Sequence, residues 1–367
     1  MRELIRQNAA LLITGILTFI LMGAGQSLYG PALPAYARDF GLSLGAAGLL
    51  VSAHWVGCAL GVGSMFALGA KVTPRVTVVI MALGAGLLAT GFSWAVTLLG
   101  GLVFGAGYGC ATVVFNPRML KAFGARGPAM VSLLNATFGI GAIGSPLVFV
   151  AMGNNPLPTF AFCTLLALGI AVFAGAAGRG GTVVAQAQSE GFRLHWPALG
   201  FAVIAIALEA TLIGLGPAAL IKAGESETHA AQLLSAFFLA FLAARVGLSF
   251  VAHLLPAFTL FTLAMLGASL SALACAMLPP SAGFVTMGFF AGMFFPSEYV
   301  TASRKMGDHP RVAPAIIAAG LVGGVLAPLL VSPFLGELGA RGFFWLAAGV
   351  SGAVALVALA SLRAMNR

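Results

Sequence analysis

Three ionisable side chains lie inside long apolar stretches of this sequence, where a charge needs a physical reason. Glu209 lies in the run AIALEATLIGLGPAALI (205–221), Arg245 in SAFFLAFLAARVG, and Glu298 in FFPSEYVTASRK. A charged side chain at the centre of a lipid bilayer costs about 2.5 to 3.5 kcal/mol on insertion scales. Charges at that depth commonly mark a substrate pathway or a proton relay, so these three residues are the first candidates for proton coupling or substrate binding.

Glu209 and Arg245 are predicted to meet between two neighbouring antiparallel helices. Glu209 follows Pro197 by 12 residues, which is about 18 Å of helix, and Arg245 precedes the end of the next apolar stretch by eight, which is about 12 Å. A long arginine side chain can span the remaining difference in depth. Two interpretations stay open: a permanent ion pair that fixes the helix register, and a carboxylate that changes its proton or its partner during a transport cycle. Burial favours a neutral carboxyl and a nearby guanidinium favours an ionised one, so such a pair can be balanced for proton exchange.

Glu298 and five uncharged polar residues complete the set of candidates. Glu298 closely precedes Arg304 and Lys305, so it is either a functional carboxylate or a charge near a helix end. The uncharged residues that we expect to line a cavity are Gln26, Tyr29, His54, Asn116 and Asn135. His54 is either a hydrogen-bonded packing histidine or a proton carrier. Asn135 is expected to form a hydrogen bond across two helices.

The composition is that of a membrane protein. The chain has 367 residues, of which 60% are hydrophobic and 7% charged, with a mean hydropathy of +1.05. A soluble domain carries about 25% charged residues, so this chain cannot build a water-exposed surface of ordinary polarity. Its apolar runs are continuous and do not alternate, which predicts membrane-spanning helices and argues against a β-barrel.

Signatures of enzymes and cofactor sites are absent from the sequence. It contains no HExxH, no nucleophile elbow and no phosphate-binding glycine loop. The four cysteines each stand alone in an apolar run, without the spacing of a metal site or a disulfide framework. We therefore expect neither an enzyme nor a protein that needs a cofactor or a metal.

Twelve apolar stretches predict twelve transmembrane helices. They cover residues 9–33, 44–69, 75–93, 95–117, 128–152, 157–177, 197–221, 228–253, 257–278, 281–303, 312–336 and 342–363. The polar segment 178–196 divides them six and six and is expected to be a cytoplasmic linker between an N-terminal domain (1–177) and a C-terminal domain (197–367). The first stretch is interpreted as an uncleaved helix, because its apolar part is too long for a signal peptide.

The basic residues predict the orientation of the chain. With the N-terminus in the cytoplasm, fourteen of the 18 lysines and arginines fall in cytoplasmic segments and three in outer loops. The positive-inside rule then places both termini in the cytoplasm, for which a bacterial cytoplasmic (inner) membrane is the expected location. The formal charge of +9 reflects this topology, so no nucleic-acid partner is expected. The expected partners are the lipid bilayer, a small-molecule substrate and protons.

The two halves of the sequence resemble each other. GIGAIGSPLV (139–148) returns as GLVGGVLAPLLV (320–331), which matches Gly141 with Gly323, and FGAGYG (104–109) is matched with FFAGMF (289–294). Two repeated halves predict an all-α integral membrane protein of twelve transmembrane helices in two pseudo-symmetric six-helix bundles, with a binding site at mid-membrane. Close helix packing is predicted by glycines spaced four apart: Gly57 and Gly61; Gly101, Gly105 and Gly109; Gly320 and Gly324.

Several of these stretches resemble the major facilitator superfamily, and within it the fucose permease-like branch of fucose–galactose–glucose–proton symporters. ALEATLIGLGPAAL followed by SAFFLAFLAARVG is similar to the seventh and eighth helices of that branch, where a glutamate precedes a Gly-Arg pair; here Ala244 precedes Arg245. LLNATFGIGAIGSPLV and FFPSEY resemble its fifth and tenth helices. The resemblance implies that the first, fourth, seventh and tenth helices line the cavity. The chain departs from the branch because its first and fourth helices hold no acid, and GAKVTPR lacks the aspartate of the usual gate.

The expected function is secondary active transport of a small solute by alternating access, coupled to protons. The resemblance implies a sugar or a related metabolite as the solute. Two alternatives stay open: an exporter of drugs or metabolites, and a transporter-like receptor or assembly factor that moves no solute.

Overall fold

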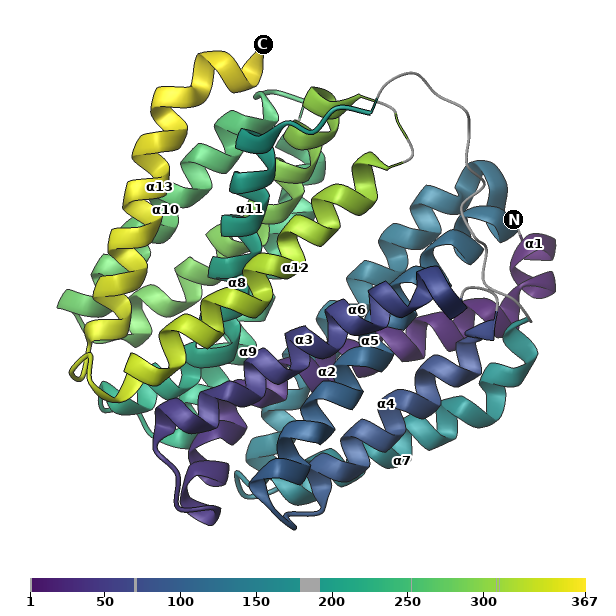
Figure 1. Ribbon diagram of the computed structural model, residues 1–367, viewed down its shortest axis with the longest axis horizontal. Coiled ribbons are helices and arrows are strands. Elements are labelled where there is room, and N and C mark those ends of the chain that lie inside the picture. Colours follow the sequence, from purple (N-terminus) through teal and green to yellow (C-terminus); the bar gives the residue numbers. More distant parts are fainter. Residues whose placement is uncertain (1, 69–70, 179–191, 252, 308, 310) are drawn as a thin grey trace. The chain divides into compact units, whose positions relative to one another are not determined.

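The computed structural model describes residues 2–68, 71–178, 192–251, 253–307, 309 and 311–367, and nearly all of that part of the chain is helical (Figure 1). It contains no strand within these residues. After the short α1 (Arg2–Gln7), the long helices are α2 (Ala9–Asp39), α3 (Leu44–Leu68), α4 (Pro74–Ala89), α5 (Trp94–Phe123), α6 (Gly127–Ala151), α7 (Pro156–Ala174), α8 (Trp196–Lys222), α9 (Glu227–Val251), α10 (Ala257–Met277), α11 (Ser281–Met306), α12 (Val312–Val331) and α13 (Gly342–Asn366). Each of the twelve predicted stretches is therefore a helix in the described structure.

Polar side chains and glycines set the ends of several helices. Thr73 and Ser93 accept hydrogen bonds from the backbone N–H groups of Val76 and Val96, and so cap the starts of α4 and α5. Such caps satisfy N–H groups that have no partner inside the helix. α5 ends at Gly124, whose φ of 52° lies in the left-handed region that glycine adopts without a steric penalty.

Two helices extend further than the sequence predicts. α2 continues through Pro31 and Pro34, and α5 continues through Pro117. The predicted ends at residues 33 and 117 therefore fall six residues short in each case. Membrane helices tolerate proline because neighbouring helices and local adjustments satisfy the backbone groups that it frees.

The helices have the length and composition of membrane spans. Ten of those in the described residues are long and apolar enough to cross a membrane, and α4 is a shorter apolar helix of 16 residues. α11 has 26 residues and is less apolar, since it carries Glu298, Arg304 and Lys305. The chain is a multi-pass membrane protein.

Contacts between Cα atoms divide the chain into two units. The first holds Met1–Leu42 and Leu49–Val184, and the second holds Ser43–Gly48 and Ala185–Arg367. In the first unit α2 packs on α6, and α4 packs on α5 and α7; in the second, α8 packs on α12, and α10 packs on α11 and α13. These pairings recur six helices later along the chain. The proposed linker at 178–196 lies largely outside the described residues, so the domain boundaries stay a prediction.

Glycines make equivalent backbone contacts in the two units. A β-carbon at Gly141 of α6 would collide with the carbonyl oxygen of Ile20 in α2, and one at Gly323 of α12 would collide with that of Val203 in α8. The absence of a side chain lets each pair of helices approach closely in lipid. The predicted match of Gly141 with Gly323 is therefore confirmed.

The contacts between α3 and α5 recur between α9 and α11, and they correct the second predicted match. The equivalent residues are 183 apart: Gly105 and Gly288, Gly109 and Gly292, His54 and Phe237, Cys58 and Phe241. In each helix pair the glycines lie against the carbonyl oxygens of the partner helix. The match of FGAGYG with FFAGMF sets residues 185 apart and is therefore wrong by two residues. Gly57 and Gly61 lie against α5 in the same way, as their spacing predicts.

Candidate functional site

An arginine and a glutamate face each other in the second unit. Arg245 Nη2 lies 3.7 Å from Glu209 Oε2, which exceeds the usual N–H···O hydrogen-bond range of about 2.7 to 3.2 Å. Glu209 is 13 residues from either end of α8, or about 20 Å of helix in each direction. Arg245 is six residues before the end of the neighbouring α9. The predicted meeting of the two side chains is observed.

Two further contacts hold the guanidinium of Arg245. Its Nε donates a long hydrogen bond of 3.4 Å to the carbonyl oxygen of Gly292 in α11, and its central carbon lies 4.3 Å from the ring centre of Phe241. A cation over an aromatic face is attracted by the ring quadrupole. The Gly292 carbonyl is within reach because α9 and α11 approach closely there: a β-carbon at Gly292 would collide with the Phe241 carbonyl oxygen.

Gly292 and Phe241 were not among the predicted site residues, although the sequence contains a signal for each. Gly288 and Gly292 stand four apart, which is the small-residue spacing of a close helix crossing. Phe241 precedes Arg245 by four residues, so the two side chains share one helix face.

The Glu209–Arg245 pair is partly exposed to solvent. The exposed fraction of the side chain is 31% for Arg245 and 12% for Glu209. Glu209 Oε2 is buried and has no hydrogen-bond partner among the described residues. An ion pair at this separation, with part of the arginine open, can release its carboxylate to another partner at a lower cost than a bidentate pair can.

Glu298 is fully buried in α11, eight residues before the end of the helix. Neither of its carboxylate oxygens has a hydrogen-bond partner in the described part of the chain, and the hydroxyl of Ser297 has none either. This burial excludes the alternative that Glu298 is a solvated charge at a helix end. An isolated ionised carboxyl is costly to bury, so Glu298 stays a candidate for a functional role.

His54 lies in a buried cluster of the first unit. Its Nδ1 is 3.2 Å from the Tyr29 hydroxyl, and its Nε2 is 3.5 Å from Cys58 Sγ. Three more rings have centres within 6.0 Å of its own: Trp55, Phe104 and Tyr108. His54 and Tyr29 are both buried, which places them inside the helix packing and not on the surface of an open cavity. The geometry favours the packing interpretation of His54.

Gln26 and Asn116 keep buried polar atoms. Gln26 is buried in α2 and Asn116 is half-buried in α5. The side-chain carbonyl oxygens Gln26 Oε1 and Asn116 Oδ1 have no hydrogen-bond partner among the residues that the structure describes. Because buried polar atoms in proteins normally have a partner, both residues stay candidates for contact with a polar ligand.

Asn135 does not make the predicted bond. It lies on an exposed side of α6, and its side-chain amide donates to the Val131 carbonyl oxygen of the same helix at 2.9 Å. The expected hydrogen bond across two helices is wrong, because asparagine can satisfy its amide one turn back along its own helix.

The internal repeat shows that the charged pair belongs to one unit. The spacing of 183 residues makes Gln26 the equivalent of Glu209 and Val62 the equivalent of Arg245. An amide thus stands where the second unit has its carboxylate, and an aliphatic side chain stands where it has its guanidinium.

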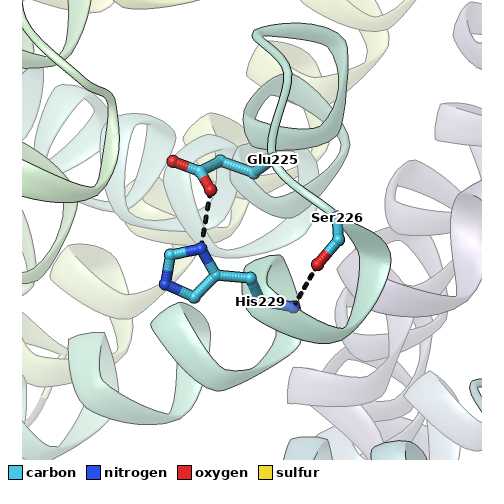
Figure 2. A network of polar contacts seen from close by, with 3 residues as sticks. All are labelled: Glu225, Ser226 and His229. Carbon is cyan, nitrogen blue, oxygen red and sulfur yellow. Dashed lines mark hydrogen bonds and ion pairs between the residues drawn. The ribbon is translucent and has the colours of Figure 1, made fainter.

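A second acid–base contact in the same unit provides a contrast (Figure 2). His229 Nδ1 lies 2.6 Å from Glu225 Oε2, and the Ser226 hydroxyl accepts a hydrogen bond from the backbone N–H of His229 at 3.1 Å. These contacts close the first turn of α9. The side chain of His229 is 46% exposed, and surface pairs of this kind contribute little energy.

Comparisons with known proteins agree with this architecture. Residues 15–318 match the Major Facilitator Superfamily. Among curated proteins, none matches the sequence. The crystal structure of a D-xylose–proton symporter is 14% identical, over 95% of this chain and 96% of that chain, with a TM-score of 0.77. That of the nucleoside transporter NupG is 13% identical, over 96% and 99%, with a TM-score of 0.77.

The fucose–proton symporter FucP of E. coli is 15% identical over 97% of this chain and 98% of its own, with a TM-score of 0.63. Its TM-score is lower than those of the xylose and nucleoside transporters, so the fucose permease-like branch is not singled out. At these identities the likeness shows the fold alone. The predicted fold class, an all-α membrane protein with the major facilitator fold, is confirmed. The sequence match covers most of the chain, which therefore belongs to the Major Facilitator Superfamily of membrane transporters.

Proposed function

We propose that this chain is a secondary active transporter that moves a small solute across the bacterial cytoplasmic membrane and couples this movement to protons. Alternating access of two six-helix halves, with both termini in the cytoplasm, is part of the proposal. Glu209, Arg245 and Glu298 are its proposed coupling or substrate-binding residues, and Gln26 and Asn116 are proposed to contact the solute.

One observation carries the proposal: the Glu209–Arg245 pair, at the middle of an apolar helix. A carboxylate about 20 Å from either helix end is costly to maintain in lipid. The pair is also poorly suited to a purely structural role, because its 3.7 Å separation makes no hydrogen bond and part of the arginine is open. A group that must exchange partners during each cycle is expected to be held in this way.

Proton coupling follows from the chemistry of the pair. Burial of Glu209 favours the neutral form of its carboxyl, and the guanidinium that it faces opposes this by favouring the ionised form. When a solute contacts Arg245 or moves it, Glu209 loses that partner and the neutral form becomes favoured, so a proton is taken up. Binding of solute and binding of the proton then favour each other, which is the thermodynamic requirement for coupled transport.

The structural neighbours support the class of activity. The titles of three of them describe a D-xylose–proton symporter, a nucleoside transporter and a peptide transporter. These solutes differ widely in chemistry, so they support transport and leave the solute to be found from the residues of this chain.

The test is transport by the purified protein in liposomes. Labelled sugars, nucleosides, peptides and organic acids would be screened with an acidic exterior, and then with the gradient reversed to detect export. Wild type is compared with Glu209→Gln and with Glu225→Gln, which removes a carboxylate from the surface contact in Figure 2. We expect Glu209→Gln to lose gradient-driven accumulation while it keeps counterflow exchange, and Glu225→Gln to behave as wild type.

Three outcomes contradict parts of the proposal. If no solute moves in either direction, the chain is not a transporter, and a receptor or assembly factor becomes the better reading. If transport is unaffected by a proton gradient, the proposed coupling to protons is wrong. If Glu209→Gln accumulates solute as wild type does, the pair has a structural role.

A further inference from the structure

We infer that Arg245 binds the carboxylate group of a small organic monoanion, and that Glu209 is the internal carboxylate which this substrate displaces. The inference rests on the proposed transport function and names the substrate class for it. It replaces the sugar that the sequence resemblance implies with a different chemical class.

The first reason is the set of unused donors on Arg245. A guanidinium has five N–H donors. In the described structure one of them, on Nε, contacts the Gly292 carbonyl, and Nη2 lies 3.7 Å from Glu209. The other contact is the face of the Phe241 ring, which uses no N–H group. The Nη groups therefore keep open donors on a side chain that is 31% exposed.

The second reason is that these donors are held in a defined direction. The Phe241 ring lies against the guanidinium, and the Gly292 carbonyl orients its Nε edge. A planar guanidinium held in this way presents its two Nη groups as a rigid fork. That fork matches the two oxygens of a carboxylate, which accept paired hydrogen bonds.

The third reason is the apolar character of the surrounding helix faces. Within one turn of Glu209, α8 carries Ala, Ile and Leu residues and Thr211, whose hydroxyl donates to the Ala207 carbonyl at 2.7 Å. From Phe241 to Leu248, the residues of α9 other than Arg245 are Phe, Leu, Ala, Val and Gly. A sugar needs several polar partners, and within one turn of Glu209 α8 supplies only the Thr211 hydroxyl, which already bonds to its own helix. An anion with one charged group and a compact apolar body needs the guanidinium as its main polar partner.

The charge balance of the exchange links the anion to one proton. Before binding, the charges of Arg245 and Glu209 balance. A monoanion that pairs with Arg245 leaves Glu209 as an additional negative charge in an apolar region, which is costly unless the carboxyl takes up a proton from water. One anion and one proton then enter together, and no net charge crosses the membrane.

Among the charged groups on the helices that pack against α8, Arg245 is the partner of Glu209. In the second unit α8 packs against α9, α11, α12 and α13. The titratable and charged groups on these helices are Glu227, His229 and Arg245 on α9, Glu298, Tyr299, Arg304 and Lys305 on α11, and Arg363 on α13; α12 has none. Arg245 is the charged group that interacts with Glu209. Lys305 donates to the Ala364 carbonyl, and on α8 itself Lys222 donates to the Leu335 carbonyl.

The experiment measures binding to the purified full-length protein with pairs of probes that differ in charge. Labelled lactate, benzoate and gluconate are compared with lactamide, benzamide and glucose, and inorganic phosphate and sulfate serve as competitors. Binding is measured between pH 5.5 and 8.5 for wild type, Arg245→Gln, Arg245→Lys and Glu209→Gln. The surface variant Glu225→Gln is the matched control, and size-exclusion profiles verify that each variant is folded.

We expect saturable binding of at least one carboxylate and none of its uncharged partner. In wild type the affinity should rise as pH falls, by up to about tenfold per pH unit, because one proton is bound with each anion. Glu209→Gln should bind the same carboxylate at least tenfold more tightly at pH 8, with no pH dependence. Arg245→Gln should lose binding, and Arg245→Lys should weaken it because lysine lacks the fork.

Three results would overturn the inference while transport itself stands. One is saturable binding and transport of an uncharged probe with no carboxylate bound at any pH. Another is carboxylate binding that Arg245→Gln leaves unchanged. Stronger competition by phosphate or sulfate than by carboxylates would assign the fork to inorganic oxyanions and would also overturn it. If no solute of any class is bound or moved, the proposed function fails instead.

Discussion

Replacing Gly141 with alanine should destabilise the protein, whereas the same change at Gly144 in the same helix should not. A β-carbon at residue 141 would lie 2.8 Å from the backbone nitrogen of Ala24 and would collide with the Ile20 carbonyl oxygen, while ordinary contact begins near 3.4 Å. At Gly144 no atom of a neighbouring helix lies within 4 Å of the added carbon. Both obstacles at Gly141 are backbone atoms, so α2 and α6 must move apart to admit the methyl group.

The expected difference between the two variants follows from this geometry. Forcing an extra methyl group into a packed interface costs about 1 to 3 kcal/mol. Alanine is favoured over glycine inside a helix by about 1 kcal/mol, and this gain is common to both variants. Gly144→Ala should therefore be as stable as wild type or more stable, and Gly141→Ala should be about 1 to 3 kcal/mol less stable than Gly144→Ala.

The chain contains a reporter for this measurement. Its four cysteines, Cys58, Cys110, Cys163 and Cys275, are free and buried. A thiol-reactive fluorophore added during heating in detergent therefore reports unfolding as these thiols become accessible. Tm should fall by several degrees for Gly141→Ala relative to Gly144→Ala. Equal Tm values would refute the close α2–α6 contact, and with it the match of Gly141 with Gly323.

Three further predictions concern the polar residues. Arg245→Gln should cost about 2 to 4 kcal/mol by leaving Glu209 without its partner, whereas the double variant with Glu209→Gln should recover most of this loss in thermal unfolding. An equal loss in the double variant would show that the arginine acts through packing. Glu298→Gln should keep the fold. Its Tm should exceed that of wild type by a margin that grows as pH rises, because burial of a carboxyl is penalised only when the carboxyl is ionised. A margin that is the same at pH 5 and pH 9 would contradict this prediction. Gln26→Glu should destabilise the first unit more at high pH than at low pH for the same reason, and adding Val62→Arg should restore part of the loss. No effect of Gln26→Glu at any pH would contradict the burial of residue 26, and no recovery on adding Val62→Arg would contradict the repeat equivalence.

The helices could be predicted from the sequence because lipid sets a simple rule for their length. Runs of about 20 apolar residues mark the spans, and the starts of all twelve were predicted within one residue. The errors concern the C-terminal ends of two helices, which the length of the apolar run does not set. α2 and α5 continue beyond the membrane-length apolar core through Pro34 and Pro117, because surrounding helices make proline tolerable.

The side-chain contacts were less accessible to sequence reasoning. The meeting of Glu209 with Arg245 could be predicted from depth alone, since two opposite charges in lipid have few other partners. The contact of Arg245 with Gly292 could not, because it depends on a backbone carbonyl that the close α9–α11 approach brings within reach. Asn135 was mispredicted because an amide can bond across a gap or back to its own helix, and only the packing decides between them.

Comparison of the two repeated units distinguishes the contacts that pack the helices from the charged residues that could have a chemical role. Glycine-to-carbonyl contacts occur at equivalent positions in both units, so they belong to the packing that any such bundle needs. The ion pair breaks the equivalence: Gln26 and Val62 stand in the first unit where Glu209 and Arg245 stand in the second. If the pair served only to hold two helices in register, the first unit would need the same device, yet it packs its helices without one. A feature that costs energy in lipid and is not needed for packing requires another reason, and the exchange of a proton or a substrate anion that we propose would supply it.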